Sequence, residues 1–220
     1  MRDLQPLQSA PMRERGRLIT IEGVDGVGKS TLAAGLHRAL ALAGIEARLL
    51  REPGGVQTSE AVRALVKDPA LSVGARAEAL LYAAARAQLV EEALAPALER
   101  GEWVLLDRFV DSSLAYQGGG RELGLEAVRE LNLFATGGLT PDRTLLLTLD
   151  GESARARASS RGEAPDRLEQ EGVDFFGRIA DAYRQLAAAE PERIRVLDAS
   201  LPAEEVVGQA LVALADLLPG

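Results

Sequence analysis

A length of 220 residues, 47% hydrophobic and 26% charged, is typical of one soluble globular domain with a substantial core. The net charge of −8 has both signs mixed along the chain, which argues against a general binder of polynucleotides or anionic membranes, because such binding needs a clustered positive surface. Cysteine is absent, which excludes disulfides, thiolate nucleophiles and cysteine-based zinc sites.

The predicted elements alternate between strand and helix behind a polar start. Residues 1–16 contain two prolines and are predicted to form a flexible extension before a single domain at 17–220. No apolar run approaches the length of a membrane span and the start lacks a signal-peptide core, so we expect a cytoplasmic protein without a membrane partner. Alternation predicts an α/β fold with a parallel sheet, whose ligands bind beyond the carboxyl ends of the strands. Strands are predicted at about 17–22, 47–50, 102–107, 143–149 and 194–198, and helices at about 29–42, 58–67, 75–99, 125–136, 152–160, 172–189 and 203–218.

One predicted helix contains a proline. Pro96 is expected to bend the helix at 75–99 near its end, because proline cannot continue the hydrogen-bond ladder of a helix.

A phosphate-binding sequence follows the first predicted strand. Residues 23–30, GVDGVGKS, fit the pattern G-x-x-x-x-G-K-[ST] between a strand and a helix. Glycines let backbone N–H groups surround a phosphate chain, Lys29 can reach the outer phosphates, and the Ser30 hydroxyl can ligate Mg²⁺. Lys29 is one of only two lysines among 25 basic residues, so composition does not explain it. The predicted phosphate-binding residues are Gly23, Asp25, Gly26, Val27, Gly28, Lys29, Ser30 and Thr31.

Further motifs restrict the class of phosphate-loop protein. The guanine-reading N-K-x-D sequence of GTPases is missing. R-E-P-G-G at 51–55 follows the second strand, and D-R-F at 107–109 ends the third and leads to S-S-L-A-Y-Q-G-G-G-R at 112–121. Tyr82 and Arg86 lie four residues apart, on one face of a predicted helix. A polar segment with D-R-L-E-Q-E carries Arg155, Arg157, Arg161 and Arg167.

Together these motifs make the chain resemble the bacterial thymidylate kinases, which phosphorylate dTMP with ATP. The resemblance runs from about Leu18 to the last helix. It implies the P-loop nucleoside monophosphate kinase fold, a five-stranded parallel sheet flanked by helices, with a mobile arginine-bearing lid at about 152–171. It also implies Mg²⁺, the substrates ATP and dTMP, no nucleic-acid polymer, and a homodimer. We expect the dimer to form through the helix at about 75–99, although burial of its alanines against its own sheet would give the same pattern.

The resemblance also implies a dTMP site. Arg51 and Arg108, at neighbouring strand ends, would hold the acceptor phosphate, since guanidinium groups match phosphate geometry. Tyr82 would stack on thymine, although a core aromatic is the alternative, and Tyr116 would pack beside C2′ and disfavour ribose. Arg86, Ser113 and Gln117 would reach the polar edge of the base, and Asp25 the sugar 3′-hydroxyl. The predicted dTMP-binding residues are therefore Asp25, Arg51, Tyr82, Arg86, Arg108, Ser113, Tyr116 and Gln117.

Charge compensation is expected from the lid. Some relatives carry an arginine in the phosphate loop where Gly26 stands, so here the lid arginines would stabilise the developing charge. Arg161 is the first candidate, followed by Arg157 and Arg167, and a solvated basic helix face is the alternative. The predicted metal site consists of Ser30, Asp107 and Asp25, although Asp107 could instead orient Arg108. The predicted catalytic residues are Lys29, Arg161, Arg108 and Asp25.

Two other functions remain open at this point. A deoxynucleoside kinase would need a carboxylate base for a sugar hydroxyl, and Glu52 could serve. A regulatory module could bind a nucleoside triphosphate without turnover.

Overall fold

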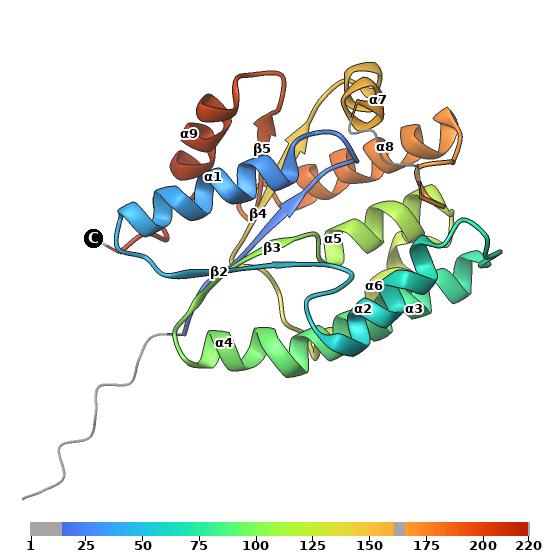
Figure 1. The fold of residues 1–220 in the computed structure, drawn as a ribbon, viewed down its shortest axis with the longest axis horizontal. Helices are drawn as coiled ribbons and strands as arrows, with labels where there is room; N and C mark the ends of the chain where they lie inside the picture. Colours follow the sequence, from blue (N-terminus) through green and yellow to red (C-terminus); the bar gives the residue numbers. More distant parts are fainter. Residues whose placement is uncertain (1–14, 161–165, 220) are drawn as a thin grey trace, which may run out of the picture.

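A single parallel sheet organises the molecule (Figure 1). The computed structural model describes residues 15–160 and 166–219. The strand order is β2-β3-β1-β4-β5 and every pairing is parallel, which confirms the predicted five-stranded α/β fold. Each strand end lies within one residue of its predicted position. The strands are β1 (Leu18–Glu22), β2 (Ala47–Arg51), β3 (Trp103–Asp107), β4 (Arg143–Thr148) and β5 (Ile194–Asp198).

Helices cover both faces of the sheet (Figure 1). In β1 all five residues are buried, which explains why its apolar run does not alternate with polar residues. Ile19 and Ile21 pack towards α1 and α9, whereas Leu18 packs towards the helical segments η1 and α4 on the other face. The helices are α1 (Lys29–Leu42), α2 (Gln57–Lys67), α3 (Ala75–Leu89), η1 (Val90–Leu94), α4 (Ala95–Glu99), α5 (Val110–Ser113), η2 (Leu114–Gly120), α6 (Leu125–Thr136), α7 (Gly151–Ser159), α8 (Val173–Ala189) and α9 (Ala203–Ala213).

Strand register brings the motif loops together. Asp107 at the end of β3 is level with Ile21 of β1 on one side and with Arg51 of β2 on the other. The three strands therefore end at one edge of the sheet, where the phosphate loop, the loop after β2 and the loop after β3 meet.

The predicted helix at 75–99 contains a π-helical turn in place of a simple bend. The N–H of Ala95 donates to the carbonyl oxygen of Val90, five residues earlier, which is the π spacing. This wider turn lies directly before Pro96, which has no N–H to donate and whose ring would clash with a carbonyl in a regular helix. The sequence predicts the position of the irregularity but not its form.

The helical segment α5–η2 was not predicted. It contains two serines and three glycines, which are weak helix formers. Packing against α8 explains it: a Cβ at Gly119 would lie 2.7 Å from Ala182, and one at Gly120 2.7 Å from Phe175. The glycines that weaken the local signal are what allow the two helices to approach closely.

Two predicted segments fall partly outside the described residues. These are residues 1–14 of the expected extension and residues 161–165 of the expected lid, which include Arg161. Gly16, at the end of the expected extension, donates its N–H to the carbonyl oxygen of Leu98 at 2.8 Å, so the chain joins the domain there. Among the helices that the structure describes, none combines the length and apolarity needed to cross a membrane.

Candidate active site

The loop between β1 and α1 leads into a helix start that can present backbone N–H groups to an anion. Gly28 precedes α1 in the left-handed conformation, no side chain of the described residues caps the helix, and its first turn has no acidic residue. Gly26 has φ 86°, and a Cβ there would lie 2.0 Å from the carbonyl oxygen of Ala154 in α7, so only glycine fits. Seven of the eight predicted phosphate-binding residues line one cleft of about 970 Å³. The eighth, Gly23, accepts hydrogen bonds at its carbonyl oxygen from the side chains of Lys29 and Arg108.

Lys29 lies inside the loop. Its side chain is 8% exposed, and Nζ donates to the carbonyl oxygens of Gly23 at 3.1 Å and Val24 at 2.9 Å. Burial, with repulsion from Arg108, lowers the pKa of Lys29 to about 8, although Asp25 opposes the shift. A bound phosphate would supply the negative charge that this buried ammonium favours.

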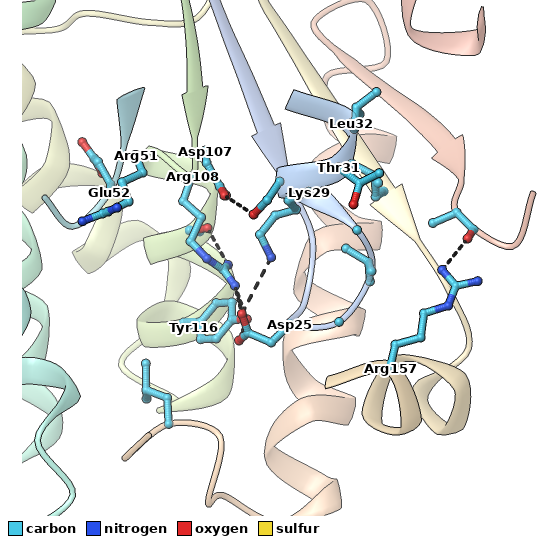
Figure 2. Close-up of a pocket in the computed structure, with 18 of the residues that line it drawn as sticks. Asp25, Lys29, Thr31, Leu32, Arg51, Glu52, Asp107, Arg108, Tyr116 and Arg157 are labelled. Carbon is cyan, nitrogen blue, oxygen red and sulfur yellow. Dashed lines mark hydrogen bonds and ion pairs between the residues drawn. The ribbon is translucent and has the colours of Figure 1, made fainter. Parts of the chain in front are cut away.

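Asp25, Arg108 and Tyr116 point toward one another beside Lys29 (Figure 2). Arg108 donates to Asp25 Oδ1 at 2.7 Å and to the hydroxyl oxygen of Tyr116 at 3.1 Å, and that hydroxyl donates to Asp25 Oδ2 at 3.1 Å. Burial opposes ionisation of Asp25, but Arg108 and Lys29 outweigh it and hold the pKa of Asp25 well below its usual range. The cluster places two cations and one carboxylate at the mouth of the phosphate loop.

The backbone at Arg108 is strained. Its φ of 71° is in the left-handed region, which non-glycine residues rarely adopt and which is typical of functional sites. The N–H of Arg108 donates to the carbonyl oxygen of Ile21 at 3.0 Å, while its guanidinium donates to Gly23 and to Ser112 Oγ, both at 3.1 Å. These contacts fix the guanidinium in the cleft before any substrate is bound.

A buried carboxylate supports this turn. Glu22 is fully buried and accepts the N–H of Phe109 at 2.8 Å, the hydroxyl of Ser112 at 2.5 Å and the hydroxyl of Tyr183 at 2.9 Å. Burial, with repulsion from Asp111, raises the pKa of Glu22 to about 7. Glu22 therefore holds the residues that follow the strained turn.

Ser30 and Asp107 fit a magnesium site. Ser30 Oγ donates to Asp107 Oδ2 at 3.5 Å (Figure 2). Asp107 Oδ1 is buried without a hydrogen-bond partner in the part of the chain that the structure describes, as expected of an oxygen that could bind a cation or its water. Mg²⁺ is usually held by one or two carboxylates plus phosphate and water, and Asp107 with Ser30 offers oxygen donors of this kind. Asp25 lies on the other side of Lys29, with its oxygens committed to Arg108 and Tyr116.

The far end of the cleft holds the predicted base-binding residues. Tyr82, Arg86, Ser113 and Gln117 all line it, as does Arg51 at the end of β2. Arg51 is half exposed and donates to Glu60 Oε1 at 3.0 Å and Oε2 at 3.2 Å. The structure therefore gathers every predicted dTMP-binding residue around one cleft.

Arg86 is buried more deeply than expected of a base-reading residue. Its side chain is 1% exposed and donates to Glu52 Oε2 at 2.8 Å, Ser113 Oγ at 2.8 Å and the carbonyl oxygen of Phe109 at 2.9 Å, and also to Asn132. To bind Arg86, a base oxygen would have to share a guanidinium N–H group with one of these acceptors or displace that acceptor.

In the described part of the predicted lid, Arg157 lines the cleft and Arg167 lies behind it. Arg157 donates to the carbonyl oxygen of Ala199 at 3.0 Å, beside the loop after β5 (Figure 2). Arg167 lies 2.7 Å from Glu78 and donates to the carbonyl oxygen of Val66. Arg161, the first candidate in the lid, lies outside the described residues.

Comparison with known proteins agrees with this geometry. The sequence model of the thymidylate kinase family matches residues 21–210. The chain belongs to the thymidylate kinase family. It is 47% identical to a thymidylate kinase of Halorhodospira halophila (94% of this chain and 98% of that protein), 48% identical to one of Deinococcus radiodurans (92% and 98%), and 51% identical to one of Leifsonia xyli subsp. xyli (91% and 95%).

Several residues that hold the site together were not predicted from the family motifs. Glu78 and Asn132 are buried polar groups that contact the predicted site residues Gln117 and Arg86. Glu22 binds Phe109 and Ser112, which follow Arg108, and Lys67 forms a 2.9 Å ion pair with Asp166 of the predicted lid. One signal was available, because Glu78 lies four residues before Tyr82 and eight before Arg86, on the same face of α3. The partners of Glu22 and Asn132 come from distant segments, so the sequence gives no comparable spacing for them.

Proposed function

We propose that this protein transfers the γ-phosphoryl group of ATP to dTMP, giving dTDP and ADP in dTTP biosynthesis. One observation carries the proposal: a single cleft has a phosphate loop at one end and, beside it, an arginine-rich pocket lined by Tyr82 and Gln117. Membership of the thymidylate kinase family agrees with it.

The acceptor phosphate is already ionised at neutral pH, so the reaction needs positioning and charge neutralisation more than a general base. Lys29 would bind the outer phosphates of ATP, and Arg108 and Arg51 the acceptor phosphate, so that donor and acceptor meet near Asp25. Asp25 would also contact the sugar hydroxyl, and the lid arginines Arg161 and Arg157 would add positive charge and exclude water. Arg167 would have to leave its 2.7 Å ion pair with Glu78 to do the same.

Ser30 and Asp107 would hold Mg²⁺, with Asp25 nearby. When bound, the metal neutralises phosphate charge and orients the phosphates. The residues themselves provide an oxygen donor set and one unpartnered buried oxygen.

The deoxynucleoside kinase alternative is disfavoured by Glu52. Its Oε2 lies 2.6 Å from Arg86 in a buried ion pair, and its Oε1 is buried without a hydrogen-bond partner among the described residues, so the side chain is held towards Arg86. Burial raises the pKa of Glu52 despite this partner. A nucleotide-sensing module would not release ADP in a manner dependent on dTMP.

We further infer a single domain at 17–220 with a lid at about 152–171. We also infer a cytoplasmic protein that forms a homodimer through the 75–99 region and has neither a nucleic-acid polymer nor a membrane as a partner. Supporting the dimer, α3 packs beside α6, and Leu80, Leu133 and Phe134 on these helices are 58%, 62% and 88% exposed. Light scattering of the wild type and of Phe134→Glu tests this, and a wild-type monomer would contradict it.

The proposed activity is tested by ADP release with ATP and, in turn, dTMP, dUMP, dCMP, dGMP and thymidine. We expect dTMP to be the best acceptor and thymidine to be inactive. ADP release that is independent of dTMP would contradict the proposal, and activity on thymidine would favour the deoxynucleoside kinase reading.

A further inference from the structure

A buried carboxylate lies behind the base-binding end of the cleft. Glu78, in the first turn of α3, has 0% exposure and does not line the cleft. Its carboxylate accepts a hydrogen bond from Nε2 of Gln117 at 2.9 Å. It also forms ion pairs with Arg121 at 3.0 Å and with Arg167 at 2.7 Å. The carboxylate thus joins α3, η2 and the lid.

The contact fixes which way the Gln117 amide points. A carboxylate can only accept hydrogen bonds, so the NH₂ group of Gln117 must face Glu78. Its carbonyl oxygen, Oε1, is then the atom available to the cleft, and no group of the described residues donates to it. Gln117 presents an acceptor to a ligand.

An acceptor at this position distinguishes pyrimidines. Thymine and uracil carry an N3–H donor, whereas cytosine carries a lone pair at N3 and an amino group at C4. A fixed acceptor therefore stabilises thymine or uracil and repels cytosine, while a freely rotating amide could pair with either. We propose that Glu78 is a positioning residue for base selection, which holds the Gln117 amide so that Oε1 faces the base. This inference rests on the proposed function.

Two guanidinium groups hold Glu78 in place. Arg121 donates to both of its oxygens, contacts Glu171 at 2.5 Å, and lies over the ring of Phe175 with 4.8 Å to the centroid. Arg167 is the lid member of the group. The carboxylate is therefore a rigid reference point, and the lid segment that binds it lies next to the group that selects the base.

The test compares Glu78→Gln with wild type and with Glu126→Gln, an exposed acid on α6 that serves as a matched control. A glutamine at 78 keeps the shape but no longer dictates the orientation of Gln117. We measure kcat/KM for dTMP, dUMP and dCMP, and the Kd values of dTMP and dCMP without ATP. We expect the preference for dTMP over dCMP to fall at least tenfold in Glu78→Gln, and the dTMP to dUMP ratio to stay within twofold, because both of those bases carry N3–H.

A purely structural role would lower activity on all three substrates equally and leave both ratios unchanged, which would overturn the inference. If Glu78→Gln does not fold, Glu78→Asp keeps the charge for the two arginines but withdraws the carboxylate from Gln117, and the same fall is expected. An unchanged dTMP to dCMP ratio in that folded variant would also overturn it. Wild-type protein that does not use dTMP would instead refute the proposed function.

Discussion

Removal of the buried carboxyl at position 22 should change how the stability of the protein depends on pH. Glu22→Gln keeps an acceptor for the N–H groups of Phe109 and Ser112, and its amide can donate to the hydroxyl oxygens of Ser112 and Tyr183. The substitution therefore removes a titratable group while retaining most of the hydrogen bonds around it.

The size of the effect follows from the pKa. The pKa of Glu22 is raised from 4.5 to about 7, first by burial and then by Asp111, with Ser112, Arg108 and Phe109 opposing the shift. Between these two pH values the unfolded chain is ionised while the folded protein keeps its proton, so stability is lost as pH rises. Complete ionisation would cost about 3 kcal/mol, and none of this cost is present below pH 4.5.

Urea unfolding of wild type and Glu22→Gln at intervals from pH 5 to 8 measures this difference. Titrating groups distant from Glu22 are common to both proteins and cancel. We expect the free energy of unfolding of the variant, relative to wild type, to rise with pH by up to about 3 kcal/mol, mostly below pH 7. The exposed-site variant Glu126→Gln should stay within about 0.5 kcal/mol of wild type throughout. Parallel curves for Glu22→Gln and wild type would refute the assignment of a raised pKa to this carboxyl.

Three further substitutions test the cleft. Arg161→Ala should lower kcat by about 100-fold if Arg161 provides a transition-state donor. Arg155→Ala, on the same segment, is the control and should leave kcat close to wild type. Equal rates of the two variants in single-turnover assays would contradict this role of Arg161. Arg108→Lys should lower kcat/KM for dTMP by about 10- to 100-fold through lost charged hydrogen bonds, with little effect on KM for ATP, and initial-rate kinetics decide it. Gly26→Ala should lower stability by more than Gly44→Ala, because both have positive φ but only Gly26 would clash, and similar melting temperatures would contradict the clash.

The fold could be predicted closely because its local signals agree with its packing. Strands β1, β3 and β4 contain apolar runs bounded by glycine or charged residues, whereas β2 and β5 also carry an arginine within the strand. The register at their carboxyl ends follows once the sheet is parallel. The segment α5–η2 could not be predicted, because its glycines are favoured only by the nearby surface of α8. A similar limit applies to the π turn, whose form depends on how Pro96 is accommodated.

The predicted site residues that the structure describes line one cleft, apart from Gly23 and Arg167, whereas the layer behind them was not predicted. The motifs contain cleft-lining residues such as Arg108 and Gln117, because the proposed phosphate and base sites need those residue types at those strand and helix ends. The supporting groups are different. Asn132 reaches Arg86 from α6, and Tyr183 reaches Glu22 from α8, so each contact joins elements far apart in the chain. Spacing in the sequence can indicate such contacts only where both partners lie on one helix.

The supporting layer has a common chemistry. Asp25 pairs with Arg108, Glu52 with Arg86 and Glu78 with Gln117, so each of three donor groups at the cleft is held by a carboxylate. These carboxylates weaken the attraction of the cleft for anions, and burial makes them costly unless they are paired. In return the donors are oriented before the substrate arrives, so little reorganisation is needed on binding. It follows that neutralising Glu52 or Glu78, whose partners are the proposed base contacts Arg86 and Gln117, should harm selectivity more than affinity for phosphate. That result would distinguish orientation from simple charge balance as the reason for their presence.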